Sequence, residues 1–426
     1  MDKYLRLYAE PETAALGGLM EVPRQAAQWT NVVVIPACNE SADFLRPPPA
    51  GPGRSLMILV INETDTAPEP VSLNNRALAA EVRERFESVW ESSEDGAGFK
   101  LALLRGEPVN QDVLLVDRFS EGRRLPPKGG VGHARKIGSD LAAWLIHHQH
   151  IRSQWIHCTD ADVRLPETYF NCRDAWLDAG PEYAALVYPF RHCGLEGFAE
   201  ADEVIRATHL YELSLHYYVA GLKFADSPYA FHTIGSTMAV NAKHYAKVRG
   251  FPKREAGEDF YLLNKLAKVG PVLELSASAD CRPIEIAARR SDRVPFGTGA
   301  AVKTISSLDN PLQEFRFYNP RVFELLQDWL KSWPVLWQSG SSDLRHYRPG
   351  LLAGLKAIGA EKALVHAFTH SKDTGQFTRQ MHTWFDAFRT LKLIHFLRDE
   401  YFPSVDYARL QAHPVYGELF TVTKRL

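Results

Sequence analysis

Cysteine is scarce in this sequence of 426 residues, and no two cysteines are close enough to form a metal-binding or redox pair. The five residues are Cys38, Cys158, Cys172, Cys193 and Cys281. Zinc sites and thioredoxin-like redox sites need cysteines at close spacings such as C-x-x-C, so both are excluded. An odd number of widely scattered cysteines is typical of a reduced intracellular protein, and we therefore expect a cytoplasmic location.

Long apolar runs are also lacking. The longest candidate, Leu56 to Ile61, is far shorter than the roughly 20 residues that a membrane-spanning helix needs. The first residues, MDKYLRLYAEPET, have neither the basic start nor the apolar run of a signal peptide, so we expect a soluble, non-exported protein. The basic and aromatic stretch from Arg379 to Phe402 could lie on a membrane surface, but a core-facing helix is the more common meaning of such a stripe.

An excess of charge of one sign is missing too. The sum of 49 Lys and Arg against 51 Asp and Glu gives a formal net charge of −2, which provides no long-range attraction for nucleic acid. Apolar residues make up 45% and charged residues 23%, which is ordinary for a folded globular protein. At this length two lobes are expected.

Short β-branched runs alternate with segments of helical periodicity. The runs that predict buried strands are Asn31 to Ile35, Leu56 to Ile61, Val113 to Asp117, Trp155 to Cys158 and Ala184 to Tyr188. The segments that predict helices are Leu73 to Glu91, Ala134 to Leu145 and about Glu200 to Lys223. The alternation predicts an α/β fold with a mostly parallel central sheet flanked by helices, in which ligands bind at the carboxyl ends of the strands.

The chain is expected to have three parts. Residues 1–30 form an N-terminal extension, residues 31–308 the α/β domain, and residues 309–426 a helical domain, because strand patterns stop near Ser306 and aromatic-rich helical patterns follow. The Pro- and Gly-rich segment Arg46 to Ser55 is expected to be a surface loop.

Two carboxylates follow the predicted strand Trp155 to Cys158. Asp160 and Asp162 are two residues apart, a spacing that points both side chains the same way in extended backbone. Such a pair suits a hard divalent cation, Mg²⁺ or Mn²⁺, which keeps open positions for phosphate oxygens. An exposed acidic turn is the alternative meaning of this short motif.

The surrounding motifs resemble those of the family 2 glycosyltransferases of the GT-A fold, which is Rossmann-like. The first, VVVIPACNE, runs from Val32 to Glu40, with Cys38 where the family usually has tyrosine. The others are ILVINETD from Ile58, GGVGHARKIGSDLA from Gly129 with Lys136 in place of an asparagine, WIHCTDADV from Trp155, and the stretch from Gly235 to Gly270 that holds a Glu-Asp pair. These five ordered segments cover about Asn31 to Gly270.

The resemblance implies roles for individual residues. It implies a nucleotide-sugar donor held by Pro36, Ala37, Asn39, Glu40, Asn62, Asp65, Arg135 and Asp160. Asp162 would be the direct metal ligand, with Asp160 on the donor's ribose or on the metal through water. Asp259, beside Glu258, would take the proton of the acceptor hydroxyl in an inverting transfer. Ordinary helix N-terminal charge is the alternative for this Glu-Asp pair.

Two further features are less specific. Some enzymes of the GT-A fold recruit a downstream histidine as an additional metal ligand, and His232 is the candidate here. The loop from Ala287 to Val302 contains Arg289, Arg290 and Arg293, which could clamp a diphosphate or form a solvated basic surface. The Q-x-x-R-W segment and membrane helices of processive synthases are not found, which favours transfer of a single sugar.

The reaction leaves alternatives open. A retaining glycosyltransferase would use the same fold with another role for Asp259, and a catalytically silent sugar-nucleotide-binding scaffold would fit the replacements at Cys38 and Lys136. A nucleotidyltransferase would be expected to begin with a glycine-rich basic signature, which Val32 to Glu40 lacks. The acceptor, whether a small molecule, a glycan or a lipid-linked sugar, is not identified.

Overall fold

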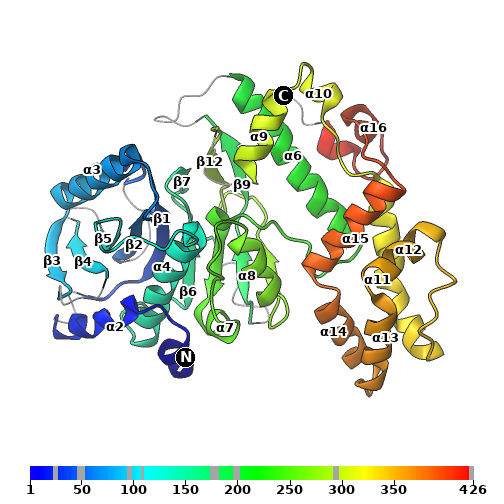
Figure 1. Cartoon of the computed structure of the whole chain (residues 1–426), viewed down its shortest axis with the longest axis horizontal. Coiled ribbons are helices and arrows are strands. Elements are labelled where there is room, and N and C mark those ends of the chain that lie inside the picture. The colour runs from blue at the N-terminus through cyan, green and yellow to red at the C-terminus, as the bar shows by residue number, and fades with distance from the viewer. Residues whose placement is uncertain are drawn as a thin grey trace. The chain divides into compact units, whose positions relative to one another are not determined.

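The structure, a computed structural model, describes residues 1–22, 27–45, 53–93, 98–106, 110–172, 182–194, 202–290 and 297–421. It divides into two compact units. The α/β unit consists of Met1–Glu200 and Thr233–Gly297, and the helical unit of Ala201–His232 and Thr298–Leu426. Figure 1 shows the strands in the α/β unit and the orange and red C-terminal helices in the helical unit.

A large sheet forms the centre of the α/β unit. Its strand order is β11-β8-β10-β6-β1-β2-β5-β4-β3. The strands are β1 (Asn31–Ala37), β2 (Ser55–Asn62), β3 (Glu87–Glu91), β4 (Lys100–Arg105), β5 (Gln111–Arg118), β6 (Trp155–Cys158), β8 (Ala185–Val187), β10 (Met238–Asn241) and β11 (Val272–Glu274). Among these strands β10 and β4 run against the others, so the predicted mostly parallel α/β sheet is confirmed.

The strand order reverses at β1. The chain proceeds from β1 to β2 on one side, and β6 later pairs with the other side of β1 in parallel. In open α/β sheets the crevice at the carboxyl ends of two strands that diverge in this way is where ligands bind. The polar residues after β1 and β6 therefore lie at the expected position of a ligand site.

Helices cover the sheet. They are α1 (Asp2–Leu7), α2 (Glu12–Ala15), α3 (Glu69–Arg85), α4 (Gly130–His147), α7 (Ala242–Lys247) and α8 (Glu258–Leu266), with the 3-10 turns η1 (Leu16–Glu21), η3 (Ala42–Phe44) and η4 (Gly235–Thr237). Helix α4 packs on β1, β2 and β6. The contact is close because a Cβ added at Gly138 would lie 2.4 Å from Cγ1 of Val34.

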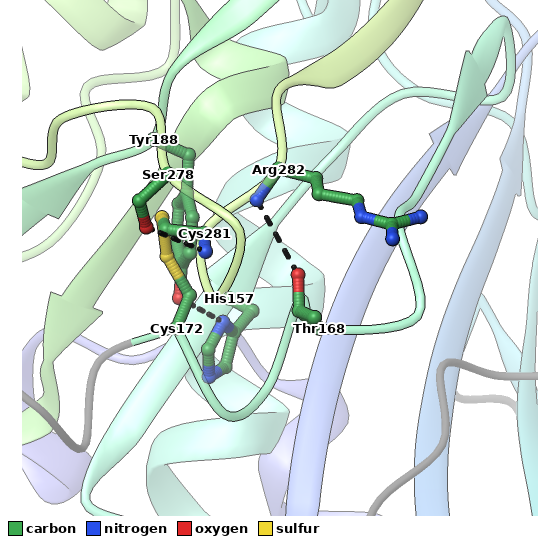
Figure 2. The surroundings of a disulfide bond; sticks show 7 residues. All are labelled: His157, Thr168, Cys172, Tyr188, Ser278, Cys281 and Arg282. Atoms are coloured by element: carbon green, nitrogen blue, oxygen red, sulfur yellow. Dashed lines mark hydrogen bonds between the residues drawn. A yellow bond between two sulfur atoms is a disulfide. The ribbon is translucent and has the colours of Figure 1, made fainter.

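A second, three-stranded sheet lies beside the acidic end of β6. Its order is β7 (Val163–Arg164), β12 (Ile284–Ala287) and β9 (Phe190–Cys193). Just outside it, Cys172 and Cys281 form a disulfide near His157 and Tyr188 (Figure 2). The prediction of five reduced cysteines is therefore wrong, because the fold brings together two residues 109 positions apart. Since disulfides persist mainly in oxidising compartments, the cysteine count no longer supports a cytoplasmic location.

The helical unit is built around aromatic side chains. Its helices are α6 (Asp202–Phe224), α9 (Thr298–Ser306), α10 (Pro311–Glu314), α11 (Pro320–Ser339), α12 (Pro349–Ala357), α13 (Ala360–Thr369), α14 (Thr374–Trp384), α15 (Ala387–Glu400) and α16 (Tyr407–Gln411), with the turn η5 (Gly417–Phe420). Its core includes the fully buried Trp329, Trp333 and Phe323 of α11. Among the described residues, no helix has the length and apolar character that crossing a membrane requires.

The observed units correct the predicted domain boundaries. Residues 201–232 belong to the helical unit although strands follow them in sequence, because α6 packs on α9 and α11. The described residues among the first 30 are part of the α/β unit and not a separate extension.

Two local predictions also change. The helix predicted over Leu73 to Glu91 ends at Arg85, and Glu87–Glu91 pairs with β4 as a strand. Most of the predicted loop Arg46 to Ser55 lies outside the described residues, and Ser55 begins β2.

Candidate functional site

Four segments meet at the carboxyl ends of β1 and β6. Glu40 follows β1, and Asp160 and Asp162 follow β6. Because β10 is antiparallel to β6 and Met238 pairs with Cys158, the turn η4 that precedes β10 reaches the same edge. The start of α8 completes the group, since the backbone N–H of Gly235 in η4 donates a hydrogen bond to the Asp259 carboxylate.

Arg135 connects the predicted Glu-Asp pair with the predicted metal strand. It projects from α4, is 2% exposed, and forms ion pairs with Glu258 through Nη1 and with Asp160 through Nη2. A Cβ at Gly235 would lie 2.3 Å from Arg135 Nη1, so only glycine leaves room for the guanidinium at that position. The glycine of η4 is thus part of the site, which the sequence motif alone did not explain.

The carboxylates of α8 differ in accessibility. Glu258 is 2% exposed and lies against Arg135, whereas Asp259 is partly exposed and accepts a hydrogen bond from the Phe260 N–H at 2.7 Å. Burial raises the pKa of both groups, Arg135 lowers it, and the neighbouring carboxylates raise it further. A raised carboxyl pKa suits a base that must accept a proton near neutral pH.

A second arginine, Arg289, lies two residues beyond β12. Its Nε donates to Asp162 Oδ2 at 2.8 Å, and its Nη2 lies 2.7 Å from Glu40 Oε1. Nη2 is also 2.7 Å from Asp162 Oδ2. Arg289 therefore joins the turn after β1 to the acidic turn after β6. Its neighbour Arg290 is exposed, and Arg293 lies outside the described residues.

Among the described residues, the site holds more carboxylates than cations. Arg135 faces the charges of Asp160, Glu258 and Asp259. The described residues contain no group of three His, Cys, Asp or Glu side chains arranged to hold a metal. The surplus negative charge and the hard oxygen donors of Asp160 and Asp162 nevertheless fit Mg²⁺ or Mn²⁺ arriving with a diphosphate, because such ions use one or two carboxylates and take their other ligands from phosphates and water.

The turn predicted to hold the nucleotide base is fixed by a residue that sequence reasoning missed. Asn75 of α3 is fully buried; its side chain donates to Asn62 O at 3.2 Å and to Glu63 at 2.9 Å, and accepts from Asn39 N at 2.9 Å. Asn39 has a positive φ of 58°, a conformation that asparagine tolerates better than most residues. An asparagine on the helix after β2 is the only signal in the sequence, and it does not by itself indicate this role.

Other predicted nucleotide-binding residues lie at the same edge with different accessibility. Pro36 and Ala37 end β1 and are buried, whereas Asp65 is exposed in the turn after β2. The Asn62 amide donates to Ala37 O and to Val60 O, both at 3.1 Å, so it links the ends of β1 and β2.

His232, the possible additional metal ligand, belongs to the helical unit. It is buried with its ring 4.8 Å from the ring of His216. Its role as a metal ligand stays a prediction.

Lys136, which replaces the asparagine of the resembled motif, has a structural partner. Its Nζ lies 2.7 Å from Asp140 Oδ2 and 3.0 Å from Tyr8 O. Asp140 is completely buried and also accepts hydrogen bonds from Tyr4 and Tyr245. Lys136 therefore attaches the N-terminal segment to α4, the helix that carries Arg135, and its presence does not indicate a decayed site.

No protein-family model and no curated protein matches the chain. Among solved structures the chain is similar to the mannosyltransferase PcManGT from Pyrobaculum calidifontis in complex with GDP-Man and Mn²⁺, at 15% sequence identity and a TM-score of 0.36. The match covers 93% of this chain and 96% of that one.

Proposed function

We propose that the protein is a glycosyltransferase that moves one sugar from a nucleotide-diphosphate sugar to an acceptor hydroxyl. The observation that carries this proposal is the meeting of Glu40, Asp160, Asp162 and Asp259 with Arg135 and Arg289 where the strand order reverses. Nucleotides bind at this position in α/β sheets. Local cations for a diphosphate and a carboxylate for an acceptor proton are both present.

Asp259 is the proposed general base. In the transfer, the acceptor oxygen forms a bond to the anomeric carbon as the bond to the diphosphate oxygen breaks, and the acceptor proton passes to Asp259. Such proton transfer contributes roughly 10²- to 10⁴-fold to rate. The pKa of both carboxyls is raised, but partial exposure supports Asp259 over Glu258, which we assign to positioning because it is buried against Arg135. In-line attack from the opposite side predicts inversion.

Asp162, assisted by Asp160, would hold Mg²⁺ or Mn²⁺ together with the donor. The ion, when bound, neutralises charge on the leaving diphosphate. Arg135 keeps the Asp160 carboxylate oriented, because its guanidinium is fixed between that carboxylate and Glu258. The end of β1 and the Asn39–Asn75–Asn62 network are proposed to hold the base and ribose.

A thermal-shift screen tests the donor. UDP-, GDP-, CMP- and dTDP-linked sugars are added with and without Mn²⁺, and a ligand at about a hundred times its Kd stabilises the fold by roughly 2.7 kcal/mol. Stabilisation by one nucleotide class that increases with Mn²⁺ supports the proposal. The proposal fails if no nucleotide sugar shifts the unfolding temperature under any metal condition.

Activity and stereochemistry separate the remaining enzymatic alternatives. With the stabilising donor and a panel of sugar, polyol and lipid-linked acceptors, ¹H NMR of the product reports the configuration at the anomeric carbon. Inversion, with a loss of at least a hundredfold in kcat for Asp259→Asn, supports the assigned base. Retention would assign Asp259 another role, and donor binding without turnover would favour the scaffold alternative.

A further inference from the structure

We propose that Arg289 is a resident counter-cation for Asp162, and that it makes divalent-cation binding depend on the arrival of a diphosphate. The proposal deepens and rests on the proposed function, since the diphosphate is that of the donor. It concerns how the site avoids holding a metal without its nucleotide.

The first observation is that Arg289 already neutralises the Asp162 carboxylate that a metal would bind. Its Nε and Nη2 lie 2.8 and 2.7 Å from the same atom, Asp162 Oδ2. A magnesium ion would have to approach a carboxylate oxygen to about 2.0–2.1 Å. Two cations beside one carboxylate repel each other, so a metal that arrives alone binds Asp162 against the charge of the guanidinium.

The second observation is that the pairing is partly withdrawn from water. The side chains of Arg289 and Asp162 are each 17% exposed, and that of Glu40 is 5% exposed. Fully exposed ion pairs are worth little, whereas partly buried ones resist separation because an unpaired charge is left in a less polar environment. Metal binding that separates Arg289 from Asp162 therefore costs free energy unless Arg289 gains a new partner.

The third observation is that the backbone holds Arg289 in place. Ala287 N donates to Asp162 O at 2.9 Å, and Ala288 N donates to Cys193 O at 2.9 Å. The residues before Arg289 are thus anchored on both sides by the small sheet. The guanidinium meets Asp162 because of this register.

The two arginines of the site differ in their freedom to move. Arg135 is 2% exposed, and it is paired with the equally buried Glu258 as well as with the partly exposed Asp160. The Arg289 side chain is 17% exposed and pairs with Glu40 and Asp162. Arg289 is therefore the arginine that can exchange a carboxylate for a phosphate.

A diphosphate supplies the exchange partner. The planar guanidinium forms two parallel hydrogen bonds with phosphate oxygens as well as with carboxylates. When Arg289 turns to the diphosphate, Asp162 becomes available to the metal. The two ligands then favour each other's binding, and the coupling is reciprocal by thermodynamic necessity.

Binding of Mn²⁺ alone tests the first half of the proposal. The free-ion EPR signal is titrated with wild type, Arg289→Gln, and Arg191→Gln as a matched control that removes an arginine paired with Glu285 on the same small sheet. We expect Arg289→Gln to bind Mn²⁺ at least tenfold more tightly than wild type and the control to match wild type. The double variant Arg289→Gln with Asp162→Asn should not show this increase in Mn²⁺ affinity.

Addition of UDP or GDP tests the coupling. The nucleoside diphosphate should raise the Mn²⁺ affinity of wild type at least tenfold, and this factor should approach one in Arg289→Gln. Arg289→Lys, which keeps the charge without the planar fork, should lie between them and provides the measurement if the glutamine variant does not fold.

The outcomes separate the two proposals. If wild type and the folded Arg289 variants bind Mn²⁺ with equal affinity, the proposal that Arg289 is a counter-cation for Asp162 is wrong. If no diphosphate binds any variant, the proposed function fails instead. The titration with Mn²⁺ alone then still decides whether Arg289 weakens metal binding at Asp162.

Discussion

Removal of the Glu10 carboxylate should destabilise the α/β unit in a way that depends strongly on pH. The Glu10 side chain is 6% exposed, with His133 Nε2 at 3.0 Å and Lys253 Nζ at 2.8 Å. Burial raises the pKa of Glu10, but the hydrogen bonds from His133 and Lys253 and the charge of Lys136 outweigh it, and the pKa falls from 4.5 to about 2.

The size and sign of the effect follow from this shift. The pKa of Glu10 falls from 4.5 to about 2. At about 1.36 kcal/mol per pKa unit, this fall corresponds to roughly 3 kcal/mol of folding stability. Because the folded pKa is depressed, this contribution is fully present above about pH 4.5. It is lost as the pH falls from there through about 2.

Urea unfolding of wild type and Glu10→Gln at several pH values measures the effect. We expect the variant to lose about 2–3 kcal/mol at pH 7, because its amide cannot balance the two lysines. The gap should shrink steadily below pH 4.5. Glu121→Gln, a change at an exposed glutamate of the same unit, should show little effect at any pH. A gap of equal size at pH 3 and pH 7 would refute the reasoning.

Three further predictions concern the site and its frame. Gly235→Ala should displace Arg135, cost about 1–3 kcal/mol in urea unfolding, and lower kcat/KM with the donor identified by the screen. Gly17→Ala, where an added Cβ meets nothing within 4 Å, should be close to neutral, so equal effects would count against the clash. Asn75→Ala should raise KM for the donor more than it lowers kcat, and an unchanged KM would remove the proposed positioning role. Reduction of the Cys172 disulfide should lower the free energy of unfolding by about 2–4 kcal/mol, and Cys172→Ser should make the protein insensitive to reductant; continued sensitivity would contradict the pairing.

The central strands of the sheet could be predicted because the residues within each strand are sufficient to indicate it. The short runs rich in β-branched and aliphatic residues that become β1, β2, β5 and β6 are buried on both faces, as the strands of parallel sheets are. The position of the acidic pair was predictable for the same reason, since Asp160 and Asp162 directly follow β6. Local pattern was sufficient wherever one segment determines its own structure.

Local pattern failed where distant partners decide. Leu78, Val82, Phe86 and Val89 continue a helical spacing past the true end of α3, but pairing with β4 turns Glu87–Glu91 into a strand. The disulfide joins residues 109 positions apart, and Arg289 meets a glutamate 249 positions away. No spacing in the sequence carries that information.

The domain boundary failed for a related reason. Helix α6 precedes two strands of the large sheet in sequence, yet its apolar residues Val204, Leu210 and Tyr217 belong to the core of the helical unit. A chain that leaves one unit and returns to it cannot be divided by composition shifts alone. Lys136 was similarly misleading, because its partner Asp140 is one helical turn away while the N-terminal segment it attaches comes from the start of the chain.

The most direct test of the central claim is calorimetric titration of the nucleoside diphosphate of the stabilising donor, with Mn²⁺ present, into wild type, Asp162→Ala and Asp280→Ala. Asp280 is an exposed aspartate of the same unit and serves as the matched control. The account predicts one binding site in wild type and in the control, and at least a tenfold weaker affinity in Asp162→Ala. Undiminished binding to folded Asp162→Ala, or no binding to wild type, would contradict a nucleotide site at the carboxyl ends of β1 and β6.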